Sequence, residues 1–225
     1  MYEASLTCKS KIPTIKHIKQ KLNAVRFELF KTTCFGNWLD LTDRSADPVL
    51  VHTFLQLETF PENAEPETLY FKLGNLPPFR YGSEEFSLIT GLHFGESPAL
   101  RSVLGDESAI NRIFGNQRLE VKEVHRVFGT LGTLDDHLSN EDAIRVCLWV
   151  MIDRFFLGRE GPLHVANTLL LTVDDLQSWN QYPWGSYVWA ATYNQMHRAI
   201  GKHRGDLRSK MTITGFFYSH SRLVK

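Results

Sequence analysis

The sequence predicts a mainly α-helical fold, a multi-helix globular domain that carries a small β-hairpin or short sheet. Along most of the chain, apolar residues recur at spacings of three and four, which is typical of helices that bury one face. One stretch, residues 68–82, instead alternates apolar and polar side chains, which indicates strands. The composition, with 43% hydrophobic and 22% charged residues, is globular, and we expect a single domain spanning residues 1–225.

The N-terminal part predicts two helices with an aromatic turn between them. Pro13 and Thr14 are typical of a helix start, and we expect the helical stripe that follows to face the core: Ile15, Ile18, Leu22, Val25 and Leu29. The segment "FGNWLDL", residues 35–41, predicts a turn held by its aromatic side chains. A second helix is expected to start with Asp47 as N-cap and Pro48 as its first residue, with three side chains turned inward: Val51, Phe54 and Leu55.

The strand signal comes next along the chain. Leu69, Phe71 and Leu73 alternate with polar residues and are followed by Gly-Asn, which predicts a hairpin. Pro77 and Pro78 restrict its second arm to an edge strand or an irregular segment. The helix "EEFSLIT" after the hairpin is expected to be capped by Ser83 and ended by Gly91.

The second half of the chain predicts further helices. A loop with a short helix is expected after Gly91. The next helix contains Ile110, Ile113 and Phe114 and is expected to end at Gly115. A further helix is indicated by the apolar stripe Val121, Val124, Phe128 and Leu131. The strongest helix, residues 140–157, is apolar on nearly every side and is expected to be the buried central one, with Ser139 and Asp142 as a capping box and Gly158 as C-cap. The last long helix is expected from Ser186 to Ile200, ended by Gly201.

The densest local pattern is "VDDLQSWNQYPWG", residues 173–185. We expect Thr172 to cap a helix whose first turn holds the two acids, Pro183 to end that helix, and Gly185 to adopt an unusual dihedral before the next helix. The Trp184 indole is expected to lock the angle between the two helices, its N–H bonded to a backbone carbonyl or to an acid. The motif is therefore interpreted as a structural corner, formed by Asp174, Asp175, Tyr182, Pro183, Trp184 and Gly185.

Signatures of several chemistries are missing from the sequence. It contains no phosphate-binding loop, no dinucleotide-binding glycine string and no His-Glu-x-x-His zinc motif, and we expect no cofactor and no metal. Its three cysteines stand apart, which favours a reducing compartment over a disulfide scaffold: Cys8, Cys34 and Cys147. Cys147 lies in an apolar helix and is expected to be buried. The acid pairs Glu84–Glu85, Asp135–Asp136 and Asp174–Asp175 are expected to support helix starts.

The zero net charge conceals basic ends and an acidic middle. Residues 1–31 carry a surplus of five positive charges and residues 195–225 a surplus of six, so the remainder carries eleven negative charges. One interpretation is that the basic ends are solvated or dock on the acidic body. The alternative is a nucleic-acid-binding surface that uses Lys16, Lys19, Lys202, Arg204 and Arg208.

No segment of the sequence suggests a membrane or a signal peptide. The longest apolar run, residues 146–152, has seven residues, far short of the roughly 20 that span a bilayer. The N-terminus lacks the apolar core of a signal peptide. We expect an intracellular protein, in the nucleus or the cytoplasm.

Three motifs carry a resemblance: "FGNWLDL", "LYFKLG" with "EEFSLITGL", and "TVDDLQSWNQYPWG". In order and spacing, residues 15–215 resemble a plant domain of unknown function that is common in transposon-derived proteins. That domain often precedes a cysteine peptidase domain similar to SUMO proteases. The pattern usually has Phe at Trp179, and the ending "GFFYSHSRLVK" departs from it, which predicts a truncated or altered C-terminus. A weaker similarity links the chain to the plant mobile domain.

The resemblance implies no reaction for this chain. The sequence lacks the His-Trp string and the Gln…Asp-Cys-Gly segment of those peptidases, so no catalytic residue is carried over. We therefore expect a non-catalytic interaction module that binds a protein partner. Two alternatives are the nucleic-acid-binding module above and an enzyme with a thiol at Cys34 or an acid at Asp174 or Asp175.

Overall fold

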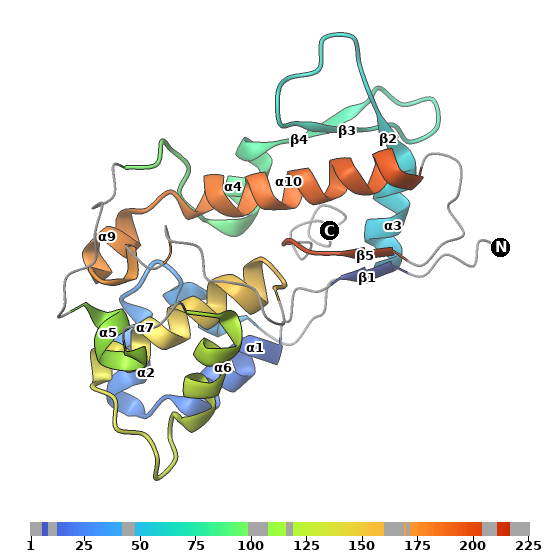
Figure 1. Cartoon of the computed structure of the whole chain (residues 1–225). Coiled ribbons are helices and arrows are strands. Elements are labelled where there is room, and N and C mark those ends of the chain that lie inside the picture. The colour runs from blue at the N-terminus through green and yellow to red at the C-terminus, as the bar shows by residue number, and fades with distance from the viewer. Residues whose placement is uncertain are drawn as a thin grey trace.

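The computed structural model describes residues 6–8, 13–41, 48–98, 108–115, 119–159, 169, 172–203 and 211–216. These residues are mainly helical and include a three-stranded antiparallel sheet and one pair of parallel strands, which confirms the predicted fold class. Figure 1 shows the long helix α10 (Trp184–His203) between that sheet and a bundle of helices. The bundle consists of α1 (Pro13–Lys21), α2 (Ala24–Lys31), α5 (Ala109–Phe114), α6 (Val121–Thr130) and α7 (Asn140–Val150).

The sheet contains the hairpin that the alternating segment predicts. β3 (Leu69–Phe71) and β4 (Phe79–Tyr81) pair antiparallel, and β4 is an edge strand, as expected from the two prolines before it. β2 (Glu58–Thr59) pairs with the other side of β3. It was not predicted, because a two-residue strand is too short to show alternation. Leu73 lies beyond the end of β3 and is 55% exposed.

Two helices flank the sheet in the chain. α3 (Pro48–Leu57) runs directly into β2 and buries Val51, Phe54 and Leu55 as predicted, while Asp47 lies outside the described residues. α4 (Ser83–Thr90) ends at Gly91, which adopts the left-handed conformation with φ 68°, as expected of a C-cap. Its cap is Gly82 and not Ser83, and the Gly82 N–H donates to the Glu85 carboxylate over 2.8 Å.

The predicted first helix is broken into two. α1 ends at Lys21, and Asn23 caps α2 by accepting a hydrogen bond from the Arg26 N–H over 2.9 Å. The break turns the second helix, so the expected stripe does not continue through Val25, which is 62% exposed. Arg26 is buried in its place, because its guanidinium finds polar partners elsewhere in the bundle. Ile15 and Ile18 are buried as predicted.

The central helix changes its geometry halfway. α7 is followed without a break by η2 (Met151–Phe156), a π-helix in which the Leu157 N–H bonds to the Ile152 carbonyl over 2.9 Å. Nearly every residue from Asp142 to Leu157 is buried, as the apolar run predicts. The Ser139 hydroxyl accepts the Asp142 N–H over 3.1 Å, which confirms the N-cap.

The remaining elements largely match expectation. Gly115, with φ 71°, ends α5, and the α6 stripe is buried at all of its predicted positions: Val121, Val124, Phe128 and Leu131. Residues 92–98 contain no helix, and residues 99–107 lie outside the described part. The aromatic turn is a short 3-10 helix, η1 (Gly36–Asp40), with Phe35 and Leu39 buried.

The two ends of the described chain meet in a parallel pair. β1 (Leu6–Cys8) pairs with β5 (Met211–Ile213). This contact joins segments about two hundred residues apart, and local sequence patterns carry no signal for it. Among the described residues, no helix is both long enough and apolar enough to cross a bilayer.

Candidate functional site

The Tyr-Pro-Trp-Gly corner joins α9 (Leu176–Gln181) to α10. The Trp184 indole is 1% exposed, and its N–H donates to the Trp179 carbonyl over 2.7 Å. Its ring lies 4.2 Å from the Trp179 ring and 5.7 Å from that of Phe35, centroid to centroid. The structure therefore places the indole inside an aromatic cluster, with its polar atom bonded to the backbone.

The bounds of α10 differ from those expected. The helix begins at Trp184, two residues before Ser186, and it continues through Gly201 to His203. Trp184 thus belongs to the first turn of the helix and not to the bend. Pro183 suits the position before this turn because its fixed φ is compatible with a helix start and no N–H is needed there.

Gly185 serves a different purpose from the one expected. It lies inside α10 and is not among the glycines with positive φ, so no unusual dihedral explains it. Its N–H donates to the His93 carbonyl over 2.7 Å. A Cβ atom at this position would stand 2.3 Å from the Phe94 ring and 2.7 Å from the His93 carbonyl oxygen. The glycine permits the backbone of residues 93–94 to lie directly against the helix.

Replacing Gly185 with alanine is expected to lower the free energy of unfolding by about 1–3 kcal/mol, since the new methyl group overpacks this contact. The measurement is a urea unfolding curve. Gly129→Ala in α6 is the matched control, because nothing lies within 4 Å of a Cβ there. Alanine in that helix is expected to stabilise the protein by up to about 1 kcal/mol. Equal unfolding midpoints for the two variants would contradict the close approach at Gly185.

The two acids of the motif hold the starts of two different helices. Asp175, and not Thr172, caps α9: its carboxylate accepts hydrogen bonds from the N–H groups of Gln177 and Ser178 over 3.0 and 3.1 Å. Asp174 lies outside α9, and its carboxylate accepts the Ala109 N–H over 2.7 Å at the first residue of α5. Both side chains are engaged with backbone donors.

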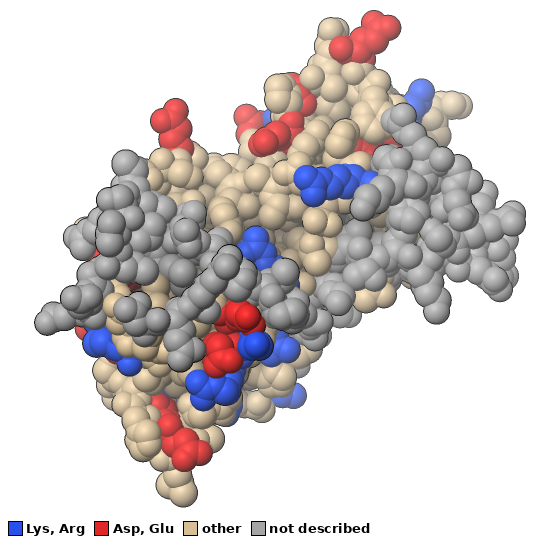
Figure 2. Space-filling view, viewed as in Figure 1, with Lys and Arg blue, Asp and Glu red and all other residues tan. Residues whose placement is uncertain are grey.

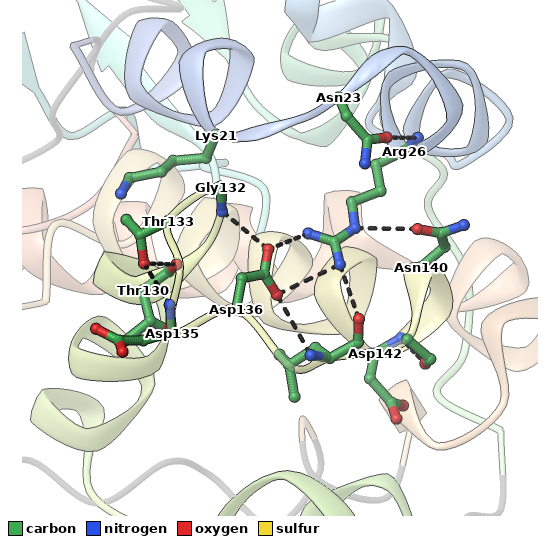
Figure 3. Close-up of polar contacts among 12 residues, drawn as sticks. Lys21, Asn23, Arg26, Thr130, Gly132, Thr133, Asp135, Asp136, Asn140 and Asp142 are labelled. Carbon is green, nitrogen blue, oxygen red and sulfur yellow. Dashed lines mark hydrogen bonds and ion pairs between the residues drawn. The ribbon is translucent and has the colours of Figure 1, made fainter.

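Arg26 forms the centre of a second polar cluster, shown in Figure 3. Its guanidinium donates to the Asn140 side chain over 3.1 Å, to the Leu138 carbonyl over 2.8 Å and to the Asp136 carboxylate. Asp136 also accepts the Gly132 N–H over 2.8 Å. Although burial alone would raise the pKa of Asp136, the hydrogen bonds from Arg26 and from backbone N–H groups hold it below its usual value. Asp136 lies in the loop before α7, and its hydrogen bonds hold this loop. It does not support a helix start, contrary to expectation.

Burial disfavours the thiolate form of Cys34 and Cys147. The Cys34 side chain is partly buried, and the Cys34 backbone N–H donates to the Asn180 side chain over 2.8 Å. Burial raises the pKa of the Cys34 thiol to about 12, so almost none of it is thiolate at neutral pH. Cys147 is buried, as predicted, and burial raises the pKa of its thiol further. In the part of the chain that the structure describes, no group of His, Cys, Asp and Glu side chains is arranged to hold a metal ion.

Asp153 is a buried acid that the sequence reasoning missed, because it directly follows the apolar run of the central helix. Its side chain is 1% exposed, and within the described residues neither carboxylate oxygen accepts a hydrogen bond. The nearest cation is Arg159, whose Nη1 lies 3.7 Å from Asp153 Oδ1. Burial raises the pKa of Asp153 to about 6, and Arg159 opposes that rise.

The turn between β3 and β4 exposes apolar side chains. Leu73, Leu76 and Phe79, here named the hairpin tip, are 55%, 61% and 40% exposed. They account for three of the eight large hydrophobic residues that are exposed in the described chain, yet they lie within seven consecutive positions. Their spacing around a Gly-Asn turn could have drawn attention to them in the sequence.

The basic candidates are only partly described. Lys16 and Lys19 lie exposed on α1, while Lys202 is in the last turn of α10 and its side chain lies outside the description. Arg204 and Arg208 lie outside the described residues. In the view of Figure 2, the Lys and Arg side chains of the described residues are interspersed with Asp and Glu side chains. A nucleic-acid surface built from these residues stays a prediction.

One comparison with known proteins gives a match. Residues 62–195, more than half of the chain, match the family model described as "Domain of unknown function (DUF1985)". This range is narrower than the 15–215 expected from the resemblance. It contains the hairpin tip, Asp153 and the whole corner motif, whereas all five basic candidates lie outside it. No curated protein and no solved structure matches the chain.

Proposed function

Because this chain belongs to the DUF1985 family of domains of unknown function, we propose its function from its own surfaces: it is a non-catalytic module that binds a protein partner through the hairpin tip. The observation that carries the proposal is the concentration of exposed Leu73, Leu76 and Phe79 in one short turn. Single exposed hydrophobic residues are ordinary on protein surfaces, whereas a local group of them is typical of a contact surface.

The backbone holds these side chains in a defined arrangement. The Leu76 N–H donates to the Leu73 carbonyl over 3.1 Å, and the Lys72 N–H donates to the Leu57 carbonyl over 2.8 Å at the base of the turn. The Phe79 ring packs against the Phe71 ring, with the two centroids 5.4 Å apart. A preformed surface loses less conformational entropy on binding.

The two prolines beside the tip favour side-chain docking over strand addition. Pro77 and Pro78 directly precede β4, the edge strand, and neither has an N–H to donate. A partner strand would therefore find few backbone donors there. We infer that the partner covers the leucines and the phenylalanine with apolar side chains of its own.

Charge favours a protein over a nucleic acid at this surface. From residue 58 to residue 85 the chain holds six acidic and two basic side chains, a surplus of four negative charges. Phosphates would be repelled, because nucleic-acid binding relies on clustered Lys and Arg. The basic candidates belong to other parts of the chain.

Two further observations support a role without catalysis. The Cys34 thiol is held protonated by burial, and Asp174 and Asp175 both accept backbone N–H groups. The resemblance to domains of transposon-derived plant proteins, which often precede a peptidase domain, fits an accessory module in such a protein. We place its action in the nucleus or the cytoplasm, with the nucleus favoured by that resemblance.

Site-specific cross-linking tests the proposal. A photo-reactive amino acid at position 76 is expected to give a discrete protein adduct in a native plant-cell extract, and Leu73→Ser is expected to remove that adduct. Position 134 is the matched control, because Leu134 is 98% exposed in the loop between α6 and α7, far from the sheet in Figure 1. Equal adducts at the two positions, or an adduct that survives Leu73→Ser, would overturn the hairpin tip as the contact surface.

A further inference from the structure

Among the described residues, the Asp153 carboxylate differs from the buried carboxylates of Asp136 and Asp142 in accepting no hydrogen bond. Asp136 accepts hydrogen bonds from Arg26 and from backbone N–H groups, and Asp142 accepts them from Arg112 and Arg145. Both carboxylate oxygens of Asp153 lack such a bond within the described chain. Buried polar groups without partners are rare in folded proteins, and each one calls for an explanation.

The surroundings of Asp153 contain little that can stabilise a negative charge. It lies in η2 among Met151, Ile152, Phe155 and Phe156, all of which are fully buried. Arg159 forms an ion pair with it, with Nη1 3.7 Å from Oδ1, and the Arg159 side chain is 30% exposed. At that distance, and partly in contact with water, the guanidinium offsets only part of the cost of burying a carboxylate.

The elements packed against η2 bring few other ionisable groups. From α10, Tyr187 lies near Arg159, and burial raises the pKa of its phenol, which therefore stays neutral. The ionisable side chains of α7, Glu141, Asp142 and Arg145, are occupied with one another or with Arg112. In α1 and η1, Lys16, His17, Lys19 and Asp40 are exposed, and Lys21 donates to the Gly129 carbonyl. Arg154, the next residue in η2, is half-buried. Arg159 is thus the main electrostatic influence on Asp153 among the described residues.

We propose that Asp153 is a proton-binding site of the folded protein and that Arg159 sets the affinity of this site for the proton. The proton comes from water and adds to a carboxylate oxygen, which converts a buried charge into a neutral acid. Because the ordinary pKa of 3.8 rises to about 6 on folding, the unfolded chain binds this proton less tightly than the folded chain. The contribution of Asp153 to stability is therefore fully present below pH 4 and is lost as the pH rises through about 6.

Tyr187 of α10 interacts with Arg159, so the proton on Asp153 is expected to affect the start of α10. Tyr187 is three residues beyond Trp184 in that helix, and the two rings are 5.9 Å apart. Mild acid is expected to strengthen the packing of η2 in this region, by removing an unsolvated charge. This inference does not depend on the hairpin tip being a binding surface.

Carbon-13 NMR of aspartate carboxyl groups in the wild-type protein tests the proposal directly. The Asp153 resonance, assigned by its loss in Asp153→Asn, is expected to titrate with a midpoint near pH 6. Arg159→Gln removes the opposing charge and is expected to move the midpoint to higher pH. A midpoint below pH 4.5, or an unchanged midpoint in Arg159→Gln, would overturn the proposal.

Unfolding curves provide an independent readout. Relative to wild type, Asp153→Asn is expected to have an unfolding constant about 100-fold lower at pH 7.5, because two pKa units correspond to two factors of ten. The advantage is expected to vanish near pH 4, where wild-type Asp153 is also neutral. A difference that stays constant from pH 4 to pH 8 would show that asparagine acts through packing alone and would contradict the proposal.

Discussion

Trp184→Ala is expected to lower the free energy of unfolding by about 3–5 kcal/mol, the usual cost of removing a fully buried aromatic side chain. The indole packs against three other rings: Trp179 in α9, Tyr182 in the corner itself, and Phe35 before η1. Alanine would leave a cavity among rigid rings that cannot collapse to fill it. Chemical unfolding monitored by circular dichroism measures the loss.

The matched variant is Trp184→Phe, which keeps most of the ring volume and removes the N–H donor to the Trp179 carbonyl. Its expected loss is smaller, about 1–3 kcal/mol, from the lost hydrogen bond and the reduced contact area, because the Trp179 carbonyl still accepts the Tyr182 N–H. Leu134→Ala, at a side chain that is 98% exposed, should change stability by less than about 0.5 kcal/mol. A loss for Trp184→Ala no larger than that of Leu134→Ala would contradict the role of the indole as an anchor.

Arg26→Met is expected to cost about 3–5 kcal/mol, because it leaves the Asp136 carboxylate with 8% exposure and without its cation. The guanidinium ties α2 to the loop before α7 through the Leu138 carbonyl and to the first turn of α7 through Asn140 (Figure 3). Methionine keeps the length of the apolar stem but makes none of these bonds. Urea unfolding at pH 7 gives the value.

A second variant separates charge burial from lost packing. Arg26→Met combined with Asp136→Asn removes both charges, and asparagine keeps an oxygen that can accept the Gly132 N–H. The double variant is expected to be more stable than Arg26→Met alone. Since the pKa of Asp136 is lowered in the fold, its contribution to stability is present above pH 4 and is lost below it. An Arg26→Met loss that persists undiminished under acid conditions would contradict the ion-pair explanation.

Local patterns predicted most of the helices because each depends on a short-range signal. The α6 stripe, the Ser139 cap and the Gly91 and Gly115 ends all appear as expected, as does the hairpin with its proline-limited edge. In each case the residue type itself carries the constraint. A left-handed glycine or a capping serine acts within a few residues of its own position.

The misses concern residues whose partners are distant in the sequence. Arg26 is buried because Asp136, 110 residues away, accepts a hydrogen bond from its guanidinium. Gly185 is required by a backbone segment 92 residues earlier, and Asp174 accepts the N–H of Ala109 in α5, 65 residues earlier. The β1–β5 pairing joins the two ends of the described chain. Periodicity cannot report such contacts, because their energy depends on what the fold brings alongside.

The corner motif illustrates the same division. Its helix–bend–helix form and the buried indole follow from the order of Asp, Pro, Trp and Gly. The bond between Asp174 and the first residue of α5, and the reason for Gly185, depend on α5 and on residues 93–94. The hairpin tip was overlooked for a different reason: the alternating pattern predicts a strand position for Leu73, whereas Leu73 lies in the turn.

The most direct test of the account measures cross-linking from position 76 and unfolding free energy together, in Trp184→Phe and in Leu73→Ser. Trp184→Phe is expected to lower stability while the folded protein keeps its partner adduct. Leu73→Ser is expected to leave stability within about 0.5 kcal/mol of wild type and to lose the adduct. The reverse result, in which Trp184→Phe loses the adduct and Leu73→Ser keeps it, would place the binding surface at Trp184. That result would contradict the assignment of function to the hairpin tip.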